Sequence, residues 1–178
     1  MGEHARILVI DDDESIRTVL ATVLEESGYT VETAASGKEG IEKTNTGFFN
    51  LALIDMRLPD MEGTQVLARV KDMTPKMRKI IITGYPSVQN AVEALNKGAH
   101  AYIMKPFDME KVLKTIEEQL KTQKEEKKFS QEKVTEFIKT RVKELEQEKP
   151  VNPRKRRKIP ISTVANYRPF GEDRMAVS

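Results

Sequence analysis

The segment LALIDMRLPDMEG, residues 51–63, is the most informative part of this chain. Its first four residues form a continuous apolar run that ends at Asp55, and a loop containing Pro59 and Gly63 follows. A continuous apolar run is typical of a strand that is buried on both faces of a parallel sheet. Proteins of the α/β class bind their ligands at the carboxyl ends of such strands. Asp55 is therefore the leading candidate for a functional residue.

Other apolar runs also end in reactive side chains. Residues 6–10 lead into Asp11 and Asp12, residues 79–82 lead into Thr83 and Gly84, and residues 101–104 lead into Lys105. We expect strands at roughly 6–11, 30–34, 50–55, 79–83 and 101–104. Because helical patterns separate these strands, we predict an α/β fold with a parallel sheet and helices on both faces.

The helices have recognisable starts and ends. An apolar stripe from Ile16 to Leu24 precedes Gly28, and Ser36 with Glu39 fits a capping box. Asp13 is expected to cap the first helix, because a carboxylate can accept from the free amides there. Further helices are predicted at residues 63–73, 88–97 and 109–121.

Composition limits the class of protein. The 178 residues include no cysteine, and no apolar run approaches the length of about 20 residues that a membrane span requires. Residues 1–122 hold 15 Lys+Arg and 19 Asp+Glu, whereas residues 123–178 hold 15 and 9. We therefore expect a cytoplasmic protein with a mildly acidic domain at residues 4–122 and a basic extension.

The extension falls into two parts. Residues 123–149 contain an amphipathic segment, with Phe129 and Ser130 placed as a hydrophobic staple and N-cap. This arrangement favours a separate helix at 130–148, although residues 122–128 would also tolerate one fused helix. Residues 150–178 carry the run Arg154-Lys155-Arg156-Arg157-Lys158 and are predicted to be disordered in isolation.

The carboxylates suggest a metal site and a nucleophile. Asp11, Asp12 and Asp55 would form the oxygen-rich site that Mg²⁺ prefers. A carboxylate beside such an ion can attack phosphorus and form an aspartyl-phosphate. Lys105 supplies a positive charge for a phosphoryl oxygen and Thr83 a hydroxyl donor, since phosphoryl transfer depends mainly on positioning and charge neutralisation.

Residues 4–122 resemble the receiver domain of two-component response regulators, including chemotaxis regulators. The resemblance rests on four motifs in this order: Asp11-Asp12, Asp55, Thr83-Gly84 and Lys105-Pro106. The resemblance implies a flavodoxin-like five-stranded sheet in the order 2-1-3-4-5. It also implies that Asp55 is the phosphoacceptor and that Asp12 and Asp55 ligate Mg²⁺, with Asp11 acting mainly through water. The Arg57 backbone carbonyl would also ligate the metal, and the Met56 and Gly84 backbones would contact the phosphoryl group. Thr83 and Tyr102 would form a switch, and the Lys105-Pro106 peptide bond would be cis.

The resemblance implies a signalling protein that catalyses only its own phosphotransfer and slow dephosphorylation. Its expected partners are a sensor histidine kinase or phosphotransfer protein and a downstream protein. The downstream protein would bind the face formed by the fourth helix, fifth strand and fifth helix, or the 130–148 helix, which could instead form a homodimer. The alternative is a nucleic-acid-binding regulator that acts through the basic tail. A phosphatase of the haloacid dehalogenase type is disfavoured, because Arg57 stands where such enzymes carry a second Asp.

Overall fold

The computed structural model describes residues 4–73 and 76–147 of the chain. The predicted basic run at 154–158 lies outside these residues. Ten elements alternate along the sequence: β1 (Arg6–Ile10), α1 (Glu14–Glu26), β2 (Thr30–Ala34), α2 (Gly37–Thr46), β3 (Leu51–Asp55), α3 (Gly63–Met73), β4 (Arg78–Thr83), α4 (Val88–Asn96), β5 (Ala101–Met104) and α5 (Met109–Gln147).

The five strands form one parallel sheet in the order β2-β1-β3-β4-β5, which confirms the predicted topology. Ile10 of β1 pairs with Ile54 of β3, and Asp55 of β3 pairs with Ile82 of β4. As a result, the carboxyl ends of β1, β3 and β4 lie at one edge of the sheet. The residues that follow these three strands are the ones that the sequence singled out.

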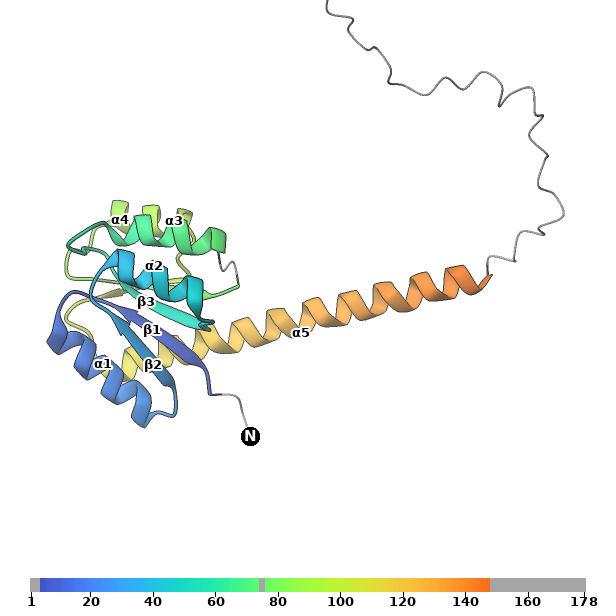
Figure 1. The fold of residues 1–178 in the computed structure, drawn as a ribbon, viewed down its shortest axis with the longest axis horizontal. Helices are drawn as coiled ribbons and strands as arrows, with labels where there is room; N and C mark the ends of the chain where they lie inside the picture. Colours follow the sequence, from blue (N-terminus) through green and yellow to red (C-terminus); the bar gives the residue numbers. More distant parts are fainter. Residues whose placement is uncertain (1–3, 74–75, 148–178) are drawn as a thin grey trace, which may run out of the picture. The chain divides into compact units, whose positions relative to one another are not determined.

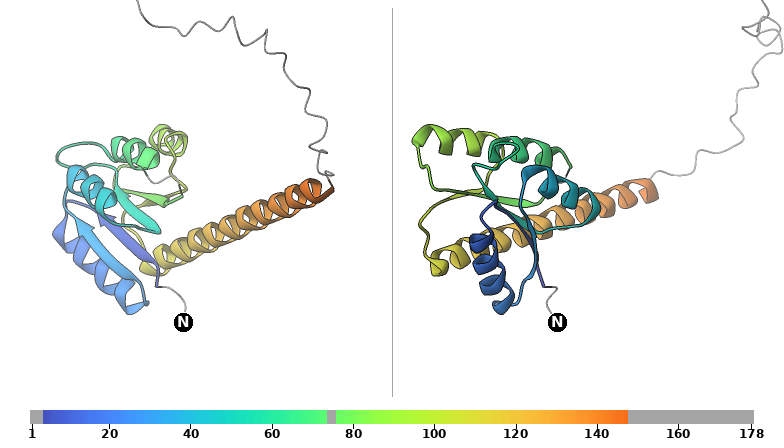
Figure 2. Two further views of the ribbon diagram at one scale, coloured as in Figure 1. Left: turned by 45° about the vertical axis from the view of Figure 1, so that its right-hand side comes forward. Right: turned by 60° about the vertical axis from the view of Figure 1, so that its left-hand side comes forward.

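Helices cover both faces of the sheet (Figures 1 and 2), and an apolar cluster lies on each face. On one face, Leu20 and Leu24 of α1 pack with Ile116 of α5 against the strands. On the other face, α3 and α4 contribute Val66, Leu67 and Ala94 to a second core, and Ile41 of α2 packs against it. β3 and β4 are buried along their whole length; β3 is apolar up to Asp55, as its sequence predicts, whereas β4 also buries Arg78 and Lys79.

Local sequence explains where the helices begin. The Asp13 carboxylate accepts hydrogen bonds from the amides of Ser15 and Ile16, so the predicted N-cap of α1 is confirmed. Ser36 accepts from the Glu39 amide at the start of α2. Both caps satisfy amides that have no partner within the helix.

The prediction of a separate helix that begins near Ser130 is wrong. α5 continues without interruption from Met109 to Gln147, and Ser130 lies inside it. Residues 122–128 are almost all good helix formers, and Pro150 is the first Pro or Gly after Met109. The alternative of one fused helix is therefore what the chain adopts.

Side chains early in the predicted extension contact the sheet. The Gln123 amide donates to the carbonyl oxygens of Asn50, at 2.9 Å, and Lys76, at 2.8 Å. Arg78, at the start of β4, forms an ion pair with Glu126 at 2.6 Å. The chain divides into two units, residues 1–133 and 134–178, so the division falls within α5.

The described part of the second unit is the helical segment 134–147. All of its residues are exposed, including Phe137 at 70% and Ile138 at 54%. No described helix of the chain is both long enough and apolar enough to cross a membrane.

Candidate functional site

Three carboxylates meet at the carboxyl edge of the sheet. One carboxylate oxygen of Asp11, one of Asp12 and one of Asp55 lie within 4.8 Å of one another. Asp11 and Asp55 are buried, whereas Asp12 is exposed. The sequence predicted this cluster, and the order of the strands brings it together, because β1 and β3 are neighbours.

Lys105 provides the positive charge of the site. Its Nζ lies 3.0 Å from Asp11 Oδ2 and 3.5 Å from Asp55 Oδ1. Burial lowers the pKa of Lys105, but the hydrogen bond to Asp11 and the charges of Asp55 and Asp11 outweigh that effect and raise it overall. The Lys105-Pro106 peptide bond is cis, as the resemblance implied.

The electrostatics of Asp55 follow from its surroundings. Burial and then the charge of Asp11 raise the pKa of Asp55 to about 6, although Lys105 and a backbone hydrogen bond from Arg57 act in the opposite direction. Desolvation and a neighbouring like charge both disfavour the ionised carboxyl. Asp55 is therefore a carboxylate whose negative charge is incompletely neutralised by the protein itself.

The donor set suits a divalent cation. The cluster offers three carboxylates against the single ammonium of Lys105. Mg²⁺ prefers oxygen ligands and commonly binds through one or two carboxylates together with water. The residues present are compatible with this ion, which would relieve the repulsion that raises the pKa of Asp55.

Thr83 and Gly84 lie beside the carboxylates. Thr83 is fully buried at the end of β4, and its hydroxyl oxygen accepts a hydrogen bond from the Tyr85 amide at 3.0 Å. A Cβ placed on Gly84 would come no closer than 4.0 Å to the Lys105 side chain. A side chain at Gly84 would therefore be in van der Waals contact with the Lys105 side chain.

Tyr102 has a buried hydroxyl. Its ring packs against the core cluster that contains Ile54 and Ile81. The hydroxyl is buried and has no hydrogen-bond partner within the part of the chain that the structure describes. An unpaired buried hydroxyl is costly, so this ring position carries a penalty that an alternative position could relieve.

Sequence reasoning missed several backbone features. The Met56 amide, which was expected to contact a phosphoryl group, donates to the Ile82 carbonyl at 3.0 Å. Gly63 is tightly enclosed, because a Cβ there would lie 2.5 Å from the Asp55 carbonyl oxygen. The position of a glycine eight residues after Asp55 was the only signal in the sequence for this packing, and the reason for the glycine is steric.

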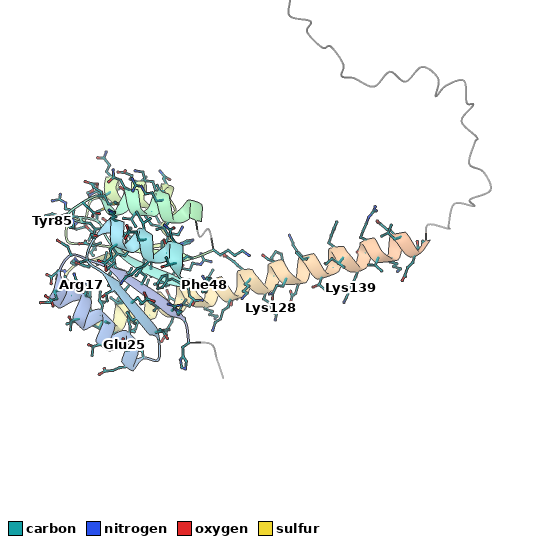
Figure 3. All side chains as sticks on the ribbon, in the orientation of Figure 1. Arg17, Glu25, Phe48, Tyr85, Lys128 and Lys139 are labelled. Carbon is teal, nitrogen blue, oxygen red and sulfur yellow. The ribbon has the colours of Figure 1, made fainter. Side chains whose placement is uncertain are left out.

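A pair of exposed side chains lies on the loops that follow β3 and β4. The Arg57 guanidinium carbon lies 3.9 Å from the centroid of the Tyr85 ring, a cation–π contact. Figure 3 labels Tyr85 and Arg17 at the same end of the first unit. Arg17 donates to the Asp11 carbonyl at 2.7 Å and so supports the loop that carries the acidic pair.

Comparison with known proteins gives a consistent result. Residues 7–117 match the family model for the response regulator receiver domain. The transcriptional regulatory protein ZraR of Klebsiella oxytoca is 41% identical over 119 residues, which is 67% of this chain and 27% of that protein. An uncharacterised transcriptional regulatory protein of Bacillus subtilis, YkoG, is 34% identical over 67% of this chain and 52% of its own length. The chain therefore spans only part of these curated relatives.

Solved structures agree with this match. The crystal structure of a CheY-like receiver domain protein from Methanospirillum hungatei has a TM-score of 0.68 and 48% identity, covering 70% of this chain and 99% of that one. The solution structure of the beryllofluoride-activated NtrC4 receiver domain dimer has a TM-score of 0.64 and 38% identity, covering 66% and 98%.

Proposed function

The chain belongs to the response regulator receiver domain family of two-component signalling, and from that premise we propose that Asp55 accepts a phosphoryl group. The observation that supports this proposal most directly is the buried Asp55 carboxylate, which lies beside two other acids and 3.5 Å from Lys105. A sensor histidine kinase or phosphotransfer protein is the proposed donor.

The proposed reaction is a displacement at phosphorus. An oxygen of Asp55 forms the new bond, and the bond from phosphorus to the donor's imidazole nitrogen breaks, so that the imidazole leaves with the electron pair. Lys105 would neutralise one phosphoryl oxygen and the Thr83 hydroxyl would donate to another, with the Gly84 backbone beside it.

We propose that Asp11, Asp12, Asp55 and the Arg57 carbonyl hold Mg²⁺. When bound, the ion supplies positive charge for the phosphoryl oxygens and for the crowded carboxylates. The protein's own part is to fix the positions of Asp55, Lys105 and Thr83 through buried strands and short loops. We further propose that the chain catalyses only its own phosphorylation and slow dephosphorylation.

A switch built from Thr83 and Tyr102 would report the modification. If the Thr83 hydroxyl turns toward the phosphoryl group, it gives up its bond to the Tyr85 amide. The Tyr102 ring, with its unpaired buried hydroxyl, would then change its balance between two positions. Because Tyr102 lies on β5, a change in its ring position would alter the face formed by α4, β5 and α5.

Two surfaces are available for output. α4 exposes Val88 at 83%, Val92 at 50% and Leu95 at 52%. The segment of α5 beyond Lys128 exposes a second apolar set, which includes Phe137 and Ile138. We propose that the first surface binds a downstream protein or a second copy of the chain, as the NtrC4 relative is described as a dimer.

A nucleic-acid output is the second candidate. It is favoured by the names of the relatives, which are transcriptional regulatory proteins. The proposed contact is the basic run at residues 154–158, which lies outside the described residues. Binding to DNA that weakens with salt and is lost on deletion of residues 150–178 would support it.

The phosphoacceptor proposal predicts labelling by a small phosphodonor. With Mg²⁺ present, the protein should take up one phosphoryl group per chain, measured as a mass increase on the intact protein. With EDTA in place of Mg²⁺ uptake should fall to background, because the crowded carboxylates are no longer neutralised. Uptake that is equal in EDTA would contradict the proposed metal site but not the nucleophile.

The Arg57–Tyr85 pair predicts slow loss of the phosphoryl group. The two side chains stand at positions that, in the family, affect the access of water to the phosphoryl group, and here they contact each other. A contact of this type is worth about 0.5–1 kcal/mol, so Tyr85→Ala should speed decay by roughly two- to fivefold. The decay of labelled protein after removal of the donor measures this rate.

The matched control is Tyr85→Phe, which keeps the ring and should keep the wild-type decay rate. Wild-type phosphoprotein that decays within seconds in Mg²⁺ buffer would refute slow dephosphorylation. Equal rates for Tyr85→Ala and Tyr85→Phe would show that the ring has no covering role.

A further inference from the structure

A groove lies at the edge of the sheet opposite to the carboxylate cluster. It has a volume of about 1160 Å³ and is lined by residues near the starts of β1, β3 and β4 and by α5 residues between 117 and 130. Phe48, one of the lining residues, lies at the opposite end of the first unit from Tyr85 (Figure 3). The groove is therefore separate from the proposed phosphorylation site, and α5 forms one wall of it.

The charge of the groove is strongly positive. Six cationic side chains line it, against the two carboxylates Glu117 and Glu126; the cations are Arg6, Lys76, Arg78, Lys121, Lys124 and Lys127. Arg6 is paired with Glu32 and Arg78 with Glu126. Within the described residues, none of the four lysines forms an ion pair. A concave surface lined by one sign of charge attracts ions of the opposite sign.

Arg78 is the buried member of this set. Its side chain is only 8% exposed, whereas that of its partner Glu126 is 66% exposed. The Nη2 atom lies 2.6 Å from the Glu126 carboxylate but makes no well-directed hydrogen bond within the described residues. A buried guanidinium needs a well-placed anion, and its planar fork matches the oxygens of a phosphate.

His100 adds a neutral donor to the groove. Its Nδ1 accepts from the Lys79 amide at 3.0 Å, so Nε2 carries the ring proton. Burial, followed by the charges of Arg78 and Lys79, lowers the pKa of His100. The rings of Tyr29 and Phe48 supply apolar surface beside these polar groups.

We propose that this groove binds the diphosphate group of a small molecule. Arg78 would contact it at the base, and Lys121, Lys124 and Lys127 would contact it from α5, since residues three apart share one side of a helix. The bound group would compete with Glu126 for Arg78. Because Glu126 and Gln123 fasten α5 to the sheet, occupancy would alter the attachment of the helix at this point.

Calorimetric titration of the full chain with inorganic pyrophosphate and with ADP tests the proposal. EDTA keeps the carboxylate cluster free of metal, and low salt keeps the electrostatic attraction strong. We expect saturable binding of one equivalent. Tighter binding of ADP than of pyrophosphate would assign the ligand to nucleotides, whereas equal binding would assign it to the diphosphate alone; both results support the proposal.

Variants locate the ligand. Lys121→Glu with Lys124→Glu should weaken binding at least about tenfold, because it reverses two charges on the wall of the groove. Glu126→Gln should tighten binding, because it removes the competing carboxylate. Lys111→Glu with Lys114→Glu is the matched control, since these lysines lie on the same helix outside the groove and should leave the affinity unchanged.

Three results would overturn the proposal. The first is the absence of saturable binding in both the wild type and Glu126→Gln. The second is an equal loss of affinity in the two double variants, which would indicate attraction by net charge alone. The third is loss of binding in Asp55→Ala, which would place the anion at the opposite edge of the sheet. The test does not depend on phosphorylation, so it can fail while the proposed function stands.

Discussion

Asp55→Asn is expected to abolish phosphorylation by a small phosphodonor in the presence of Mg²⁺. The change keeps the size of the side chain but removes the nucleophilic carboxylate. The neighbouring acids cannot replace it, because Asp11 is held by Lys105 Nζ at 3.0 Å and by the Asp13 amide at 2.9 Å. Intact mass should show one phosphoryl group on the wild type and none on the variant.

Asp13→Asn is the matched control for this experiment. Asp13 lies beside the acidic pair, but its carboxylate caps α1, and Asn caps helices about as well as Asp does. This variant should accept the phosphoryl group like the wild type. A labelled Asp55→Asn protein would show that another residue is the acceptor.

In EDTA, the free energy of unfolding is expected to rise as the pH is lowered from about 7.5 to about 5. The pKa of Asp55 is about 6 in the folded protein, against an ordinary value of 3.8, so the folded state binds this proton more tightly than the unfolded state does. Above about pH 6 the ionised carboxyl therefore destabilises the fold, by at most about 3 kcal/mol for a shift of this size. That cost begins to fall as the pH drops below about 6 and is fully lost only below the ordinary value of 3.8, so about half of it is recovered by about pH 5.

The same reasoning predicts that Asp55→Asn is more stable than the wild type at neutral pH in EDTA. Its stability should also depend less on pH in this range, because its amide does not titrate. Saturating Mg²⁺ should remove most of the difference, since bound cation favours the ionised carboxyl. Urea unfolding at several pH values measures these effects, again with Asp13→Asn as the control.

Two outcomes would contradict this explanation. One is a wild-type stability in EDTA that increases with pH between about 5 and 7.5. The other is an Asp55→Asn protein with an unchanged pH dependence. The lowered pKa of His100 acts in the opposite direction within this range, because its folded form binds the proton less tightly than its unfolded form does; Asp55→Asn keeps His100, so the difference between the two proteins isolates the effect of Asp55. The lowered pKa values of Glu39 and Asp60 also act in the opposite direction, because the stability that they contribute is lost as the pH falls through those values. Keeping the measurements at about pH 5 and above limits this contribution.

Much of the fold could be read from local patterns. Continuous apolar runs identified the strands, and Ser36, Asp13 and the glycines after the helices identified helix ends. The motif around Asp55 identified the family and hence the order of the strands. The error concerned α5, because an isolated capping pattern at Phe129-Ser130 was given more weight than the unbroken helix-forming sequence before it.

Local sequence specifies which side chains end the strands, and it thereby made Asp55, Thr83 and Lys105 the candidates for the site. The charge balance of the site depends on the packing of the whole domain, because the pKa of Asp55 reflects its burial and its distance from Asp11 and Lys105. The packing of the domain also places Arg57 against Tyr85, and it brings Arg78, Glu126 and Gln123 together at the edge of the sheet opposite to the carboxylate cluster. Local patterns follow from backbone geometry and burial along the chain, whereas these contacts join residues that are distant in sequence and depend on how the helices pack against the sheet.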